Sequence, residues 1–331
     1  MHSGLSKVFF ISWEDHRRTR EICSALGIEL HTLVTSSRGL LRYLRLIPRT
    51  LRLLSRKRAH TVIVQNPSIV LSILAILVRP LFSLRVIMDA HNEAVLPYLN
   101  RHFVVRWVAR WLHKRSDHVI VTNKQLADIV ESHGGRPLIL PDRIPEPPAG
   151  ETPIPMRGPF NVVLVATFAR DEPIGAVLKA AAQLGPEFQF YVTGNDRNLA
   201  SALRAEKPAN VTFTGFLNEL QYWSALRAAD LVVDLTLIDN CLVCGAYEAL
   251  AVGTPLVLSR NAASIDLFAG AARFADNSAN AIAQAIREAK ASAAELRAQV
   301  GSVSERLRTR WEQHAAIVRR HLVLSPSRRR P

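Results

Sequence analysis

Three ionisable side chains follow one short apolar run in the first half of the sequence. The run LRVIMDA (84–90) leads directly into HNEA, which brings Asp89, His91 and Glu93 within five residues. Histidine titrates near neutral pH, and a neighbouring carboxylate can stabilise its charged form. This grouping suits a general base that takes a proton from a hydroxyl. The alternative is a structural histidine that caps the turn through Asn92, because polar groups at strand ends often only satisfy the backbone.

A second acid and base follow the first apolar run of the chain. KVFFIS (7–12) leads into WEDHRR, where Asp15 and His16 are adjacent. The carboxyl end of a strand in a parallel sheet is a usual place for ligands. Nothing in the sequence ranks this pair against Asp89 and His91, so all four residues are candidate catalytic groups.

The second half of the chain contains a helix that could start beside a ligand. IDNCLVCGAYEALAVGTPLVLS follows the apolar run DLVVDLT (230–236). Asn240 suits an N-cap, and Gly253 followed by Pro255 suits the end of a helix of about three turns. The start of such a helix has unpaired N–H groups and the positive end of the helix dipole, which favour an anion such as a diphosphate. The N–H groups concerned belong to Cys241, Leu242 and Val243.

Glu248 lies about two turns into this predicted helix, among apolar residues (GAYEALAV). Its carboxylate could accept hydrogen bonds from a pair of vicinal hydroxyls, such as those of a ribose. The alternative is a solvated helix residue. The apolar surroundings favour the ligand, since a glutamate is seldom buried without a partner.

The elements that must position these residues are read from the apolar runs, which alternate with helical segments. This alternation is typical of parallel sheets with crossover helices. The predicted strands are 7–12, 29–35, 60–65, 84–90, 117–122 and 136–141, then 160–168, 187–195, 210–216, 230–236 and 254–259. We therefore expect an α/β protein with two Rossmann-like, doubly wound domains that face a cleft.

A proline-rich segment separates the two series of strands. Residues 141–159 contain seven prolines and no helix or strand period, which is typical of a stiff linker. A length of 331 residues also fits two domains. The predicted boundaries are 1–145 for the first domain, 146–159 for the linker, 160–300 for the second domain and 301–331 for a C-terminal helix with a basic tail.

Composition excludes several classes of protein. The three cysteines, Cys23, Cys241 and Cys244, favour a reducing compartment, and one CxxC with no second pair or nearby histidine is weak evidence for zinc. The N-terminus has no apolar run long enough for a signal peptide. The longest apolar stretch, 69–78, is about half the length that spans a bilayer, so we expect no integral membrane protein.

The two-domain pattern together with NCLVCGAYEALAVGTPLVLS resembles the GT-B glycosyltransferases, in particular family 4 of the nucleotide-sugar enzymes. The resemblance is weak over most of the chain and firmer over 160–268. Other similar stretches are VATFARDEP (165–173), TGFLNELQYWSALRAADLVVDL (214–235), MDAHNEA (88–94) and VTNKQLADIV (121–130). The resemblance implies a donor of UDP- or GDP-sugar type, no cofactor, and a hexosyltransferase-type activity that needs no metal.

This sequence departs from the family pattern at two places. The family usually has two glutamates with seven residues between them, of which the second binds the ribose and the first the donor sugar. Glu248 matches the second, but Asn240 stands at the first. The family also has an arginine and a lysine that neutralise the diphosphate. Arg170 suits the first of these cations, whereas DEP (171–173) stands near the expected lysine.

The resemblance assigns further residues to the donor. His91 corresponds to a polar residue that touches the donor sugar. Gly215 and Phe216 stand where it implies a nucleobase pocket, and Thr193 and Gly194 have the same status. A turn glycine and a core phenylalanine explain such residues nearly as well.

A cationic stripe lies in the first domain, in RGLLRYLRLIPRTLRLLSRKR (38–58). Its six arginines fall within an arc of about 80° on a helix; they are Arg38, Arg42, Arg45, Arg49, Arg52 and Arg56. The predicted core face is opposite and consists of Leu40, Tyr43, Leu44, Ile47, Leu51 and Leu54. Leu41, Leu46 and Leu53 flank the arginines, and Pro48 predicts a kinked helix or two shorter ones.

An anionic membrane surface is the partner that this stripe suits best. Residues 1–150 hold 22 Lys and Arg against 11 Asp and Glu, and no acid lies between residues 30 and 88. A solvated face would mix both signs of charge. A nucleic-acid surface would add aromatic residues, which disfavours it here. Leucines that border arginines can enter a bilayer while the guanidinium groups meet lipid phosphates.

These predictions combine into one function. We expect a cytoplasmic glycosyltransferase, peripherally associated with the inner face of the plasma membrane, that extends a lipid-linked or glycan acceptor in cell-surface polysaccharide or glycolipid biosynthesis. The first domain would hold the acceptor and the second the nucleotide sugar. The alternatives are a GT-B epimerase or phosphorylase, and a degenerate, non-catalytic GT-B subunit that binds a membrane partner.

Overall fold

The computed structural model describes residues 8–57, 60–66, 68–95, 102–195, 197 and 201–323. The chain divides into two compact units, which we call the first domain (1–143 with 310–331) and the second domain (144–309). The first domain thus includes the end of the C-terminal helix, which the predicted boundaries set apart.

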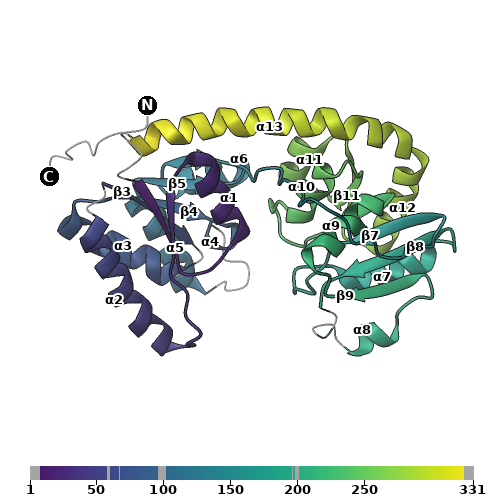
Figure 1. Ribbon diagram of the computed structural model, residues 1–331, viewed down its shortest axis with the longest axis horizontal. Coiled ribbons are helices and arrows are strands. Elements are labelled where there is room, and N and C mark those ends of the chain that lie inside the picture. The colour runs from purple at the N-terminus through teal and green to yellow at the C-terminus, as the bar shows by residue number, and fades with distance from the viewer. Residues whose placement is uncertain are drawn as a thin grey trace. The chain divides into compact units, whose positions relative to one another are not determined.

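The first domain contains a parallel six-stranded sheet with the order β2-β1-β3-β4-β5-β6 (Figure 1). Its elements are β1 (Val8–Ser12), α1 (Arg17–Leu26), β2 (Glu29–Thr32), α2 (Leu40–Lys57), β3 (Thr61–Asn66), α3 (Ile69–Phe82), β4 (Arg85–Ala90), α4 (Asn92–Val95), α5 (Phe103–Arg115), β5 (His118–Val121), α6 (Lys124–Ser132) and β6 (Pro137–Ile139). Each predicted strand of this half is present; β3 is shifted by one residue, and the other strands are shorter than predicted.

Helices cover both faces of this sheet, which explains why its strands are continuous apolar runs. Phe9 and Ile11 point to one face, where α2, α3, α5 and α6 contribute to the core. Phe10, the residue between them, points to the other face, against α1 and the C-terminal part of α13 (Ala293–Val323). Burying each such side chain stabilises the fold by about 1.5–3 kcal/mol.

The second domain contains a parallel six-stranded sheet with the order β12-β11-β10-β7-β8-β9. Its elements are β7 (Phe160–Leu164), α7 (Ile174–Gln183), β8 (Phe188–Thr193), α8 (Ser201–Ala205), β9 (Val211–Gly215), α9 (Glu219–Ala228), β10 (Leu231–Asp234), α10 (Cys244–Ala251), β11 (Leu256–Ser259), α11 (Ala262–Phe268), β12 (Ala272–Ala275), α12 (Ala279–Ala291) and the first part of α13. The sequence does not predict the strand β12.

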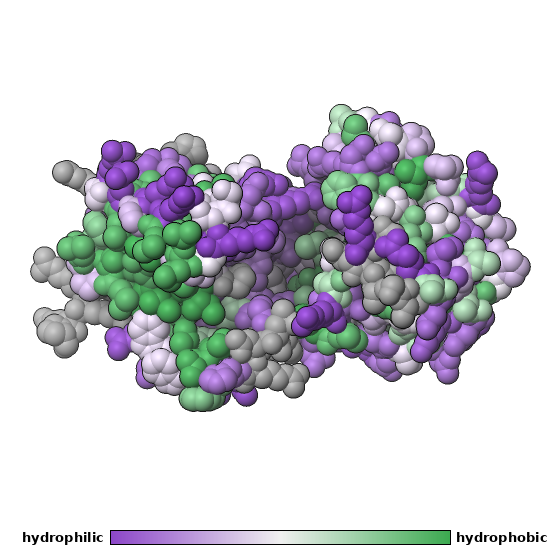
Figure 2. All heavy atoms as spheres, turned by 90° about the horizontal axis from the view of Figure 1, so that it is seen from below, coloured by the Kyte–Doolittle hydropathy of each residue, from purple (hydrophilic) through white to green (hydrophobic). Residues whose placement is uncertain are grey.

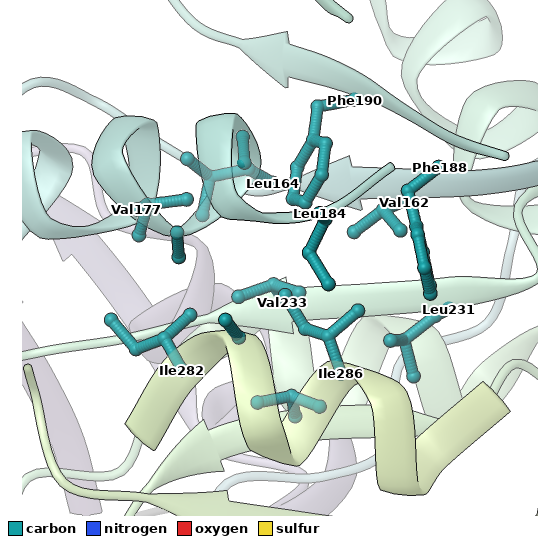
Figure 3. Close-up of a cluster of buried hydrophobic side chains, with 14 of the residues drawn as sticks. Val162, Leu164, Val177, Leu184, Phe188, Phe190, Leu231, Val233, Ile282 and Ile286 are labelled. Carbon is teal, nitrogen blue, oxygen red and sulfur yellow. The ribbon is translucent and has the colours of Figure 1, made fainter. Parts of the chain in front are cut away.

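The core on one face of this sheet lies between the strands and helices α7 and α12 (Figure 3). Phe190 of β8, Val233 of β10 and Ile286 of α12 are fully buried in it. Helices α9, α10 and α11 and the first part of α13 cover the other face. Both domains are therefore three-layered Rossmann-like folds, as the sequence predicts.

The strand order reverses between β7 and β10 in the second domain and between β1 and β3 in the first. Helices leave the sheet in opposite directions at such a point, so a crevice opens beyond the carboxyl ends of the two strands. These two places are where each domain could hold a ligand.

Candidate active site

A cavity of about 700 Å³ opens in the second domain where β7 and β10 end. It is lined by Val165, Ala166, Thr167, Glu172, Thr193, Gly194, Asn195, Phe216, Leu217, Glu219, Tyr222, Asp234, Val243, Cys244, Gly245 and Glu248. These residues end or follow β7, β8, β9 and β10 or lie in helices α9 and α10, as expected for a site at the reversal of strand order. The volume is within the range of small-molecule sites.

Glu248 is held in this cavity by a tyrosine. The Tyr222 hydroxyl of α9 donates a hydrogen bond of 2.5 Å to Glu248 Oε2 of α10. Burial, followed by the charge of Glu248, raises the pKa of Tyr222 well above its usual value, so the phenol stays protonated and remains a donor. Only 9% of Glu248 is exposed. The structure therefore presents a carboxylate of fixed orientation to a ligand.

Asp234 is a second buried carboxyl of the cavity. It ends β10, and its Oδ2 atom accepts a hydrogen bond of 2.9 Å from the Gly245 N–H. A Cβ atom at position 245 would lie 2.4 Å from that oxygen, so only glycine lets α10 start so close to the strand. Burial raises the pKa of Asp234 well above its usual value, and the charges of Glu248 and Glu172 act in the same direction.

Glu172 accepts hydrogen bonds from the loop after β7. Its carboxylate is 2.9 Å from the Thr167 N–H, 2.7 Å from the Thr167 hydroxyl and 2.8 Å from the Phe168 N–H. Phe168 has a φ of 60°, which lies in the left-handed region. Successive backbone N–H groups of this kind are a common binding site for phosphate oxygens. In this chain a carboxylate of the protein occupies them.

The charge of the cavity differs from that expected for a diphosphate site. Its lining includes four carboxyl groups, those of Glu172, Glu219, Asp234 and Glu248, and among the described residues no Lys, Arg or His lines it. Arg170 is exposed and does not line the cavity. The cation that the sequence assigns to the diphosphate is therefore not brought to this cavity.

The predicted donor-binding residues divide into two groups. The cavity brings together Thr193, Gly194, Phe216, Val243 and Glu248. It is not lined by Arg170, Gly215, Asn240, Cys241 or Leu242. Gly194 has a φ of 100°, and a Cβ atom there would lie 2.1 Å from the Ala166 carbonyl oxygen, so this glycine allows β8 to approach the loop after β7.

The predicted start of the donor helix is corrected by the structure. Asn240 has a φ of 58° and lies in a turn, whereas α10 begins at Cys244 with Val243 as its N-cap. A left-handed residue cannot be the extended N-cap of a helix. The helix start is consequently at Val243 to Gly245, where Asp234 already accepts from the Gly245 N–H.

The sequence does not predict several of the lining residues, among them the four that set the polar contacts described above: Glu172, Tyr222, Asp234 and Gly245. Asp234 could have been found, because it lies near the carboxyl end of the predicted strand DLVVDLT, as Asp89 does in LRVIMDA. Tyr222 gives no such signal, since it lies in the middle of a helix and meets Glu248 only in the folded chain.

The first domain brings His16, His91 and Asp89 together. The two imidazole rings are 4.9 Å apart, edge to face. Asp89 is buried at the end of β4 and pairs with Arg18 at 3.4 Å, and its Oδ2 is 3.9 Å from His91 Nε2. Burial lowers the pKa of His91; Asp89 opposes this, whereas Arg18 and His16 add to it. His91 is therefore neutral at pH 7, as a general base requires.

Asp15 is separated from this group. It is exposed and pairs with Arg20 on α1, whereas the neighbouring His16 turns toward His91. Glu93 lies in the short helix α4 and is half-buried. Of the acid and base residues expected after β1, the structure thus brings only His16 to the histidine cluster.

The arginine stripe lies on α2, apart from Arg38, which precedes it; α2 is one helix with Pro48 inside it. Five residues of the stripe are exposed, namely Arg38, Arg45, Arg49, Arg52 and Arg56, while Arg42 is half-buried and pairs with Glu14 at 2.9 Å. Two predicted membrane contacts are corrected: Leu46 is fully buried in the core and Leu53 is half-buried against it. Leu41 is exposed, as are Leu40 and Leu44, which the sequence assigns to the core face.

Comparison with known proteins agrees with this fold. Residues 4–140 match the family model of the Glycosyl transferase 4-like domain, and residues 159–291 match the model of Glycosyl transferases group 1. The two models together cover most of the chain, which belongs to the GT-B glycosyltransferases. No curated protein matches the chain significantly in sequence.

Solved structures with the same fold cover nearly the whole chain. Sucrose-phosphate synthase from Thermosynechococcus elongatus has a TM-score of 0.75 at 17% identity, over 95% of this chain and 98% of its own. HepE from Anabaena, in complex with UDP and glucose, has a TM-score of 0.71 at 13% identity, over 94% and 99%. A putative UDP-N-acetylglucosamine 2-epimerase from Listeria monocytogenes has a TM-score of 0.57 at 13% identity, over 94% and 97%.

Proposed function

We propose that this glycosyltransferase takes its sugar from a nucleotide sugar that binds in the second-domain cavity. The observation that carries the proposal is the Glu248 carboxylate, oriented by the Tyr222 hydroxyl at 2.5 Å beside the ends of β7 and β10. A buried carboxylate of fixed orientation suits the two hydroxyls of a ribose. HepE was solved in complex with UDP, which supports a UDP-type donor; a GDP-type donor is the other choice.

We propose that His91 acts on the sugar in the first domain. Its lowered pKa leaves the imidazole neutral at pH 7, so it can accept a proton from an acceptor hydroxyl or a hydrogen bond from the donor sugar. Asp89 lies near it and would stabilise its charged form. His16 packs edge to face against the ring and would orient it. The transferred group is proposed to be a hexosyl unit, and the reaction is proposed to need no metal and no cofactor.

The proposed acceptor is lipid-linked, in cell-surface polysaccharide or glycolipid biosynthesis, at the inner face of the plasma membrane. The cationic first domain supports this choice, because arginines on one helix attract anionic lipid. Among the described residues, no helix is both long and apolar enough to cross a bilayer. The protein would then meet its acceptor as a peripheral protein.

A second function is favoured by one observation, the four carboxyl groups of the cavity without a lining cation among the described residues. A cavity of that charge opposes a free diphosphate, which favours a degenerate GT-B subunit that binds a membrane partner and transfers no sugar.

Incubation of the purified protein with labelled UDP- and GDP-sugars and a bacterial lipid extract tests the proposal. We expect label in the organic phase with one donor, and its loss in E248A. Label released as free or epimerised sugar would instead identify an epimerase, and label transferred to added inorganic phosphate would identify a phosphorylase. Absence of both turnover and nucleotide binding would identify the degenerate subunit.

A further inference from the structure

Large apolar side chains are exposed on three neighbouring helices of the first domain. Helix α3 packs against both α2 and α5. Leu44 of α2 is 62% exposed, Leu77 of α3 is 65% exposed and Trp107 of α5 is 63% exposed. Leu81 of α3 and Phe103 of α5 are exposed to a still greater extent. We call these five residues the apolar face.

Figure 2 shows that hydrophobic side chains gather on the surface of this domain over these helices. Each of the three helices also has a buried side that packs into the core. Leu46 of α2, Leu71 of α3 and Leu112 of α5 are fully buried under them. The apolar face is thus additional to the core, and exposed apolar patches of this kind usually mark an interaction site.

The charged side chains on the three helices that carry the apolar face are all basic. The sequences of α2, α3 and α5 contain no Asp or Glu. They contain many cations, and Arg45, Arg49, Arg106 and Arg110 are exposed. A solvated helix normally carries both signs, so the absence of Asp and Glu from three separate helices indicates an anionic partner.

We propose that the apolar face enters an anionic lipid surface. Its leucines and aromatic rings would lie below the headgroups, Trp107 would lie at the boundary, and the surrounding arginines would bind lipid phosphates. A second copy of the chain fits less well, because it would bring two cationic surfaces together. Nucleic acid also fits less well, because three of the five residues are leucines, which neither stack on bases nor bind phosphate.

This inference rests on the proposed membrane location. It attributes the binding to the apolar face as well as to the arginine stripe. The arginine stripe alone would give attraction that salt screens almost completely. The apolar face adds burial of hydrocarbon, which salt does not screen, and it extends the contact to α3 and α5, which lie outside the stripe. Binding should therefore weaken with salt but not vanish.

Vesicle flotation of the full chain tests the proposal. The vesicles contain either phosphatidylcholine alone or phosphatidylcholine with about one-third phosphatidylglycerol. We expect the wild type to float with the anionic vesicles at low salt and to retain part of this binding in about 0.5 M NaCl. The double variant L77S/L81S and the single variant W107A should each bind at least about tenfold less.

The matched control is I265S, which removes an exposed apolar residue from α11 of the second domain. It should float like the wild type. Equal flotation of L77S/L81S, W107A and the wild type would overturn the proposal, as would complete loss of wild-type binding in high salt. A dimer that these substitutions abolish, without lipid binding, would overturn it too and would identify a second copy as the partner.

Thermal unfolding and nucleotide binding are measured on the same samples as controls for folding and for the donor site. Thermal unfolding should agree between the variants and the wild type, because the substituted side chains are exposed. Nucleotide binding should also be unchanged, since the apolar face is not part of the second-domain cavity. Loss of flotation with nucleotide binding intact would thus support the face, whereas absence of nucleotide binding in every sample would count only against the proposed donor.

Discussion

The Tyr222 hydroxyl donates a hydrogen bond of 2.5 Å to Glu248 Oε2, and the two residues come from different helices of the second domain. The bond joins α9 to α10 at the wall of the cavity. It converts a glutamate that the sequence places inside an apolar helix into a carboxylate with a defined direction. The proposed donor site depends on that direction.

Replacing Tyr222 with phenylalanine should weaken donor binding about 3- to 10-fold, because a hydrogen bond to a charged group contributes about 1.5–3 kcal/mol and part of this orients Glu248. Calorimetric titration with the nucleotide sugar measures it. Y191F is the matched control, since the Tyr191 hydroxyl accepts from the Arg157 N–H at 2.8 Å and does not line the cavity. Equal losses in Y222F and Y191F would show that Tyr222 acts only on stability.

Glu172 should oppose the donor diphosphate. Its carboxylate occupies the N–H groups of Thr167 and Phe168, so E172Q should bind a nucleoside diphosphate about 3- to 10-fold more tightly through loss of like-charge repulsion. The comparison is with E206Q, which changes an exposed glutamate outside the cavity. Weaker binding by E172Q would mean that Glu172 instead holds the loop in its binding conformation.

Protonation of His91 should cause the fall of kcat/KM at low pH. Because burial lowers the pKa of His91, the ring stays neutral down to a pH below 6.5, and activity should fall only under that value. The same shift contributes stability above pH 6.5 that is lost as the pH falls, since the unfolded chain then binds the proton more readily. The measurement is sugar transfer between about pH 5 and 8.

Substitutions separate the roles of the two candidate groups in the first domain. H91A should lose most of the transfer and its lower pH limb, whereas D15A should keep both, because Asp15 is exposed and pairs with Arg20. Donor hydrolysis, measured beside transfer, distinguishes a base for the acceptor from a residue that binds the donor. Wild-type turnover in H91A would exclude His91 from the reaction.

Transfer should survive a chelator. The sequence has no DxD-type pair of carboxylates at a strand end, and GT-B sites as a class stabilise the diphosphate without metal. Activity measured with and without EDTA should agree within error. Loss of activity in EDTA that magnesium or manganese restores would contradict this prediction, and the four carboxyl groups of the cavity would then be the first residues to examine.

The fold could be predicted from the sequence because its central strands are buried on both faces. VFFIS and TVIVQ read as apolar runs for this reason, and the alternation with helices follows from it. The strand β12 could not be predicted, because its four residues, ARFA, contain an arginine and two alanines, and the strand forms through pairing with β11. No local pattern marks such a strand.

The orientation of α2 could not be predicted for a related reason. Its own sequence suggests a core face opposite the arginines, but Leu46 and Thr50 are buried and Leu44 is exposed. The buried side of this helix is decided by its packing on α3, a partner that the residues of α2 do not encode. The role of Glu172 could not be predicted either, because its carboxylate meets the Thr167 N–H only when the loop after β7 is folded.

The central claim, that the second-domain cavity binds a nucleotide sugar through Glu248, is tested most directly by calorimetric titration of UDP-, GDP- and ADP-sugars into the wild type and E248A. The wild type should bind one UDP- or GDP-type ligand, and E248A should bind it at least about tenfold more weakly, since two hydrogen bonds to a charged group are lost. Absence of binding to the wild type, or equal affinity in E248A, would contradict the claim.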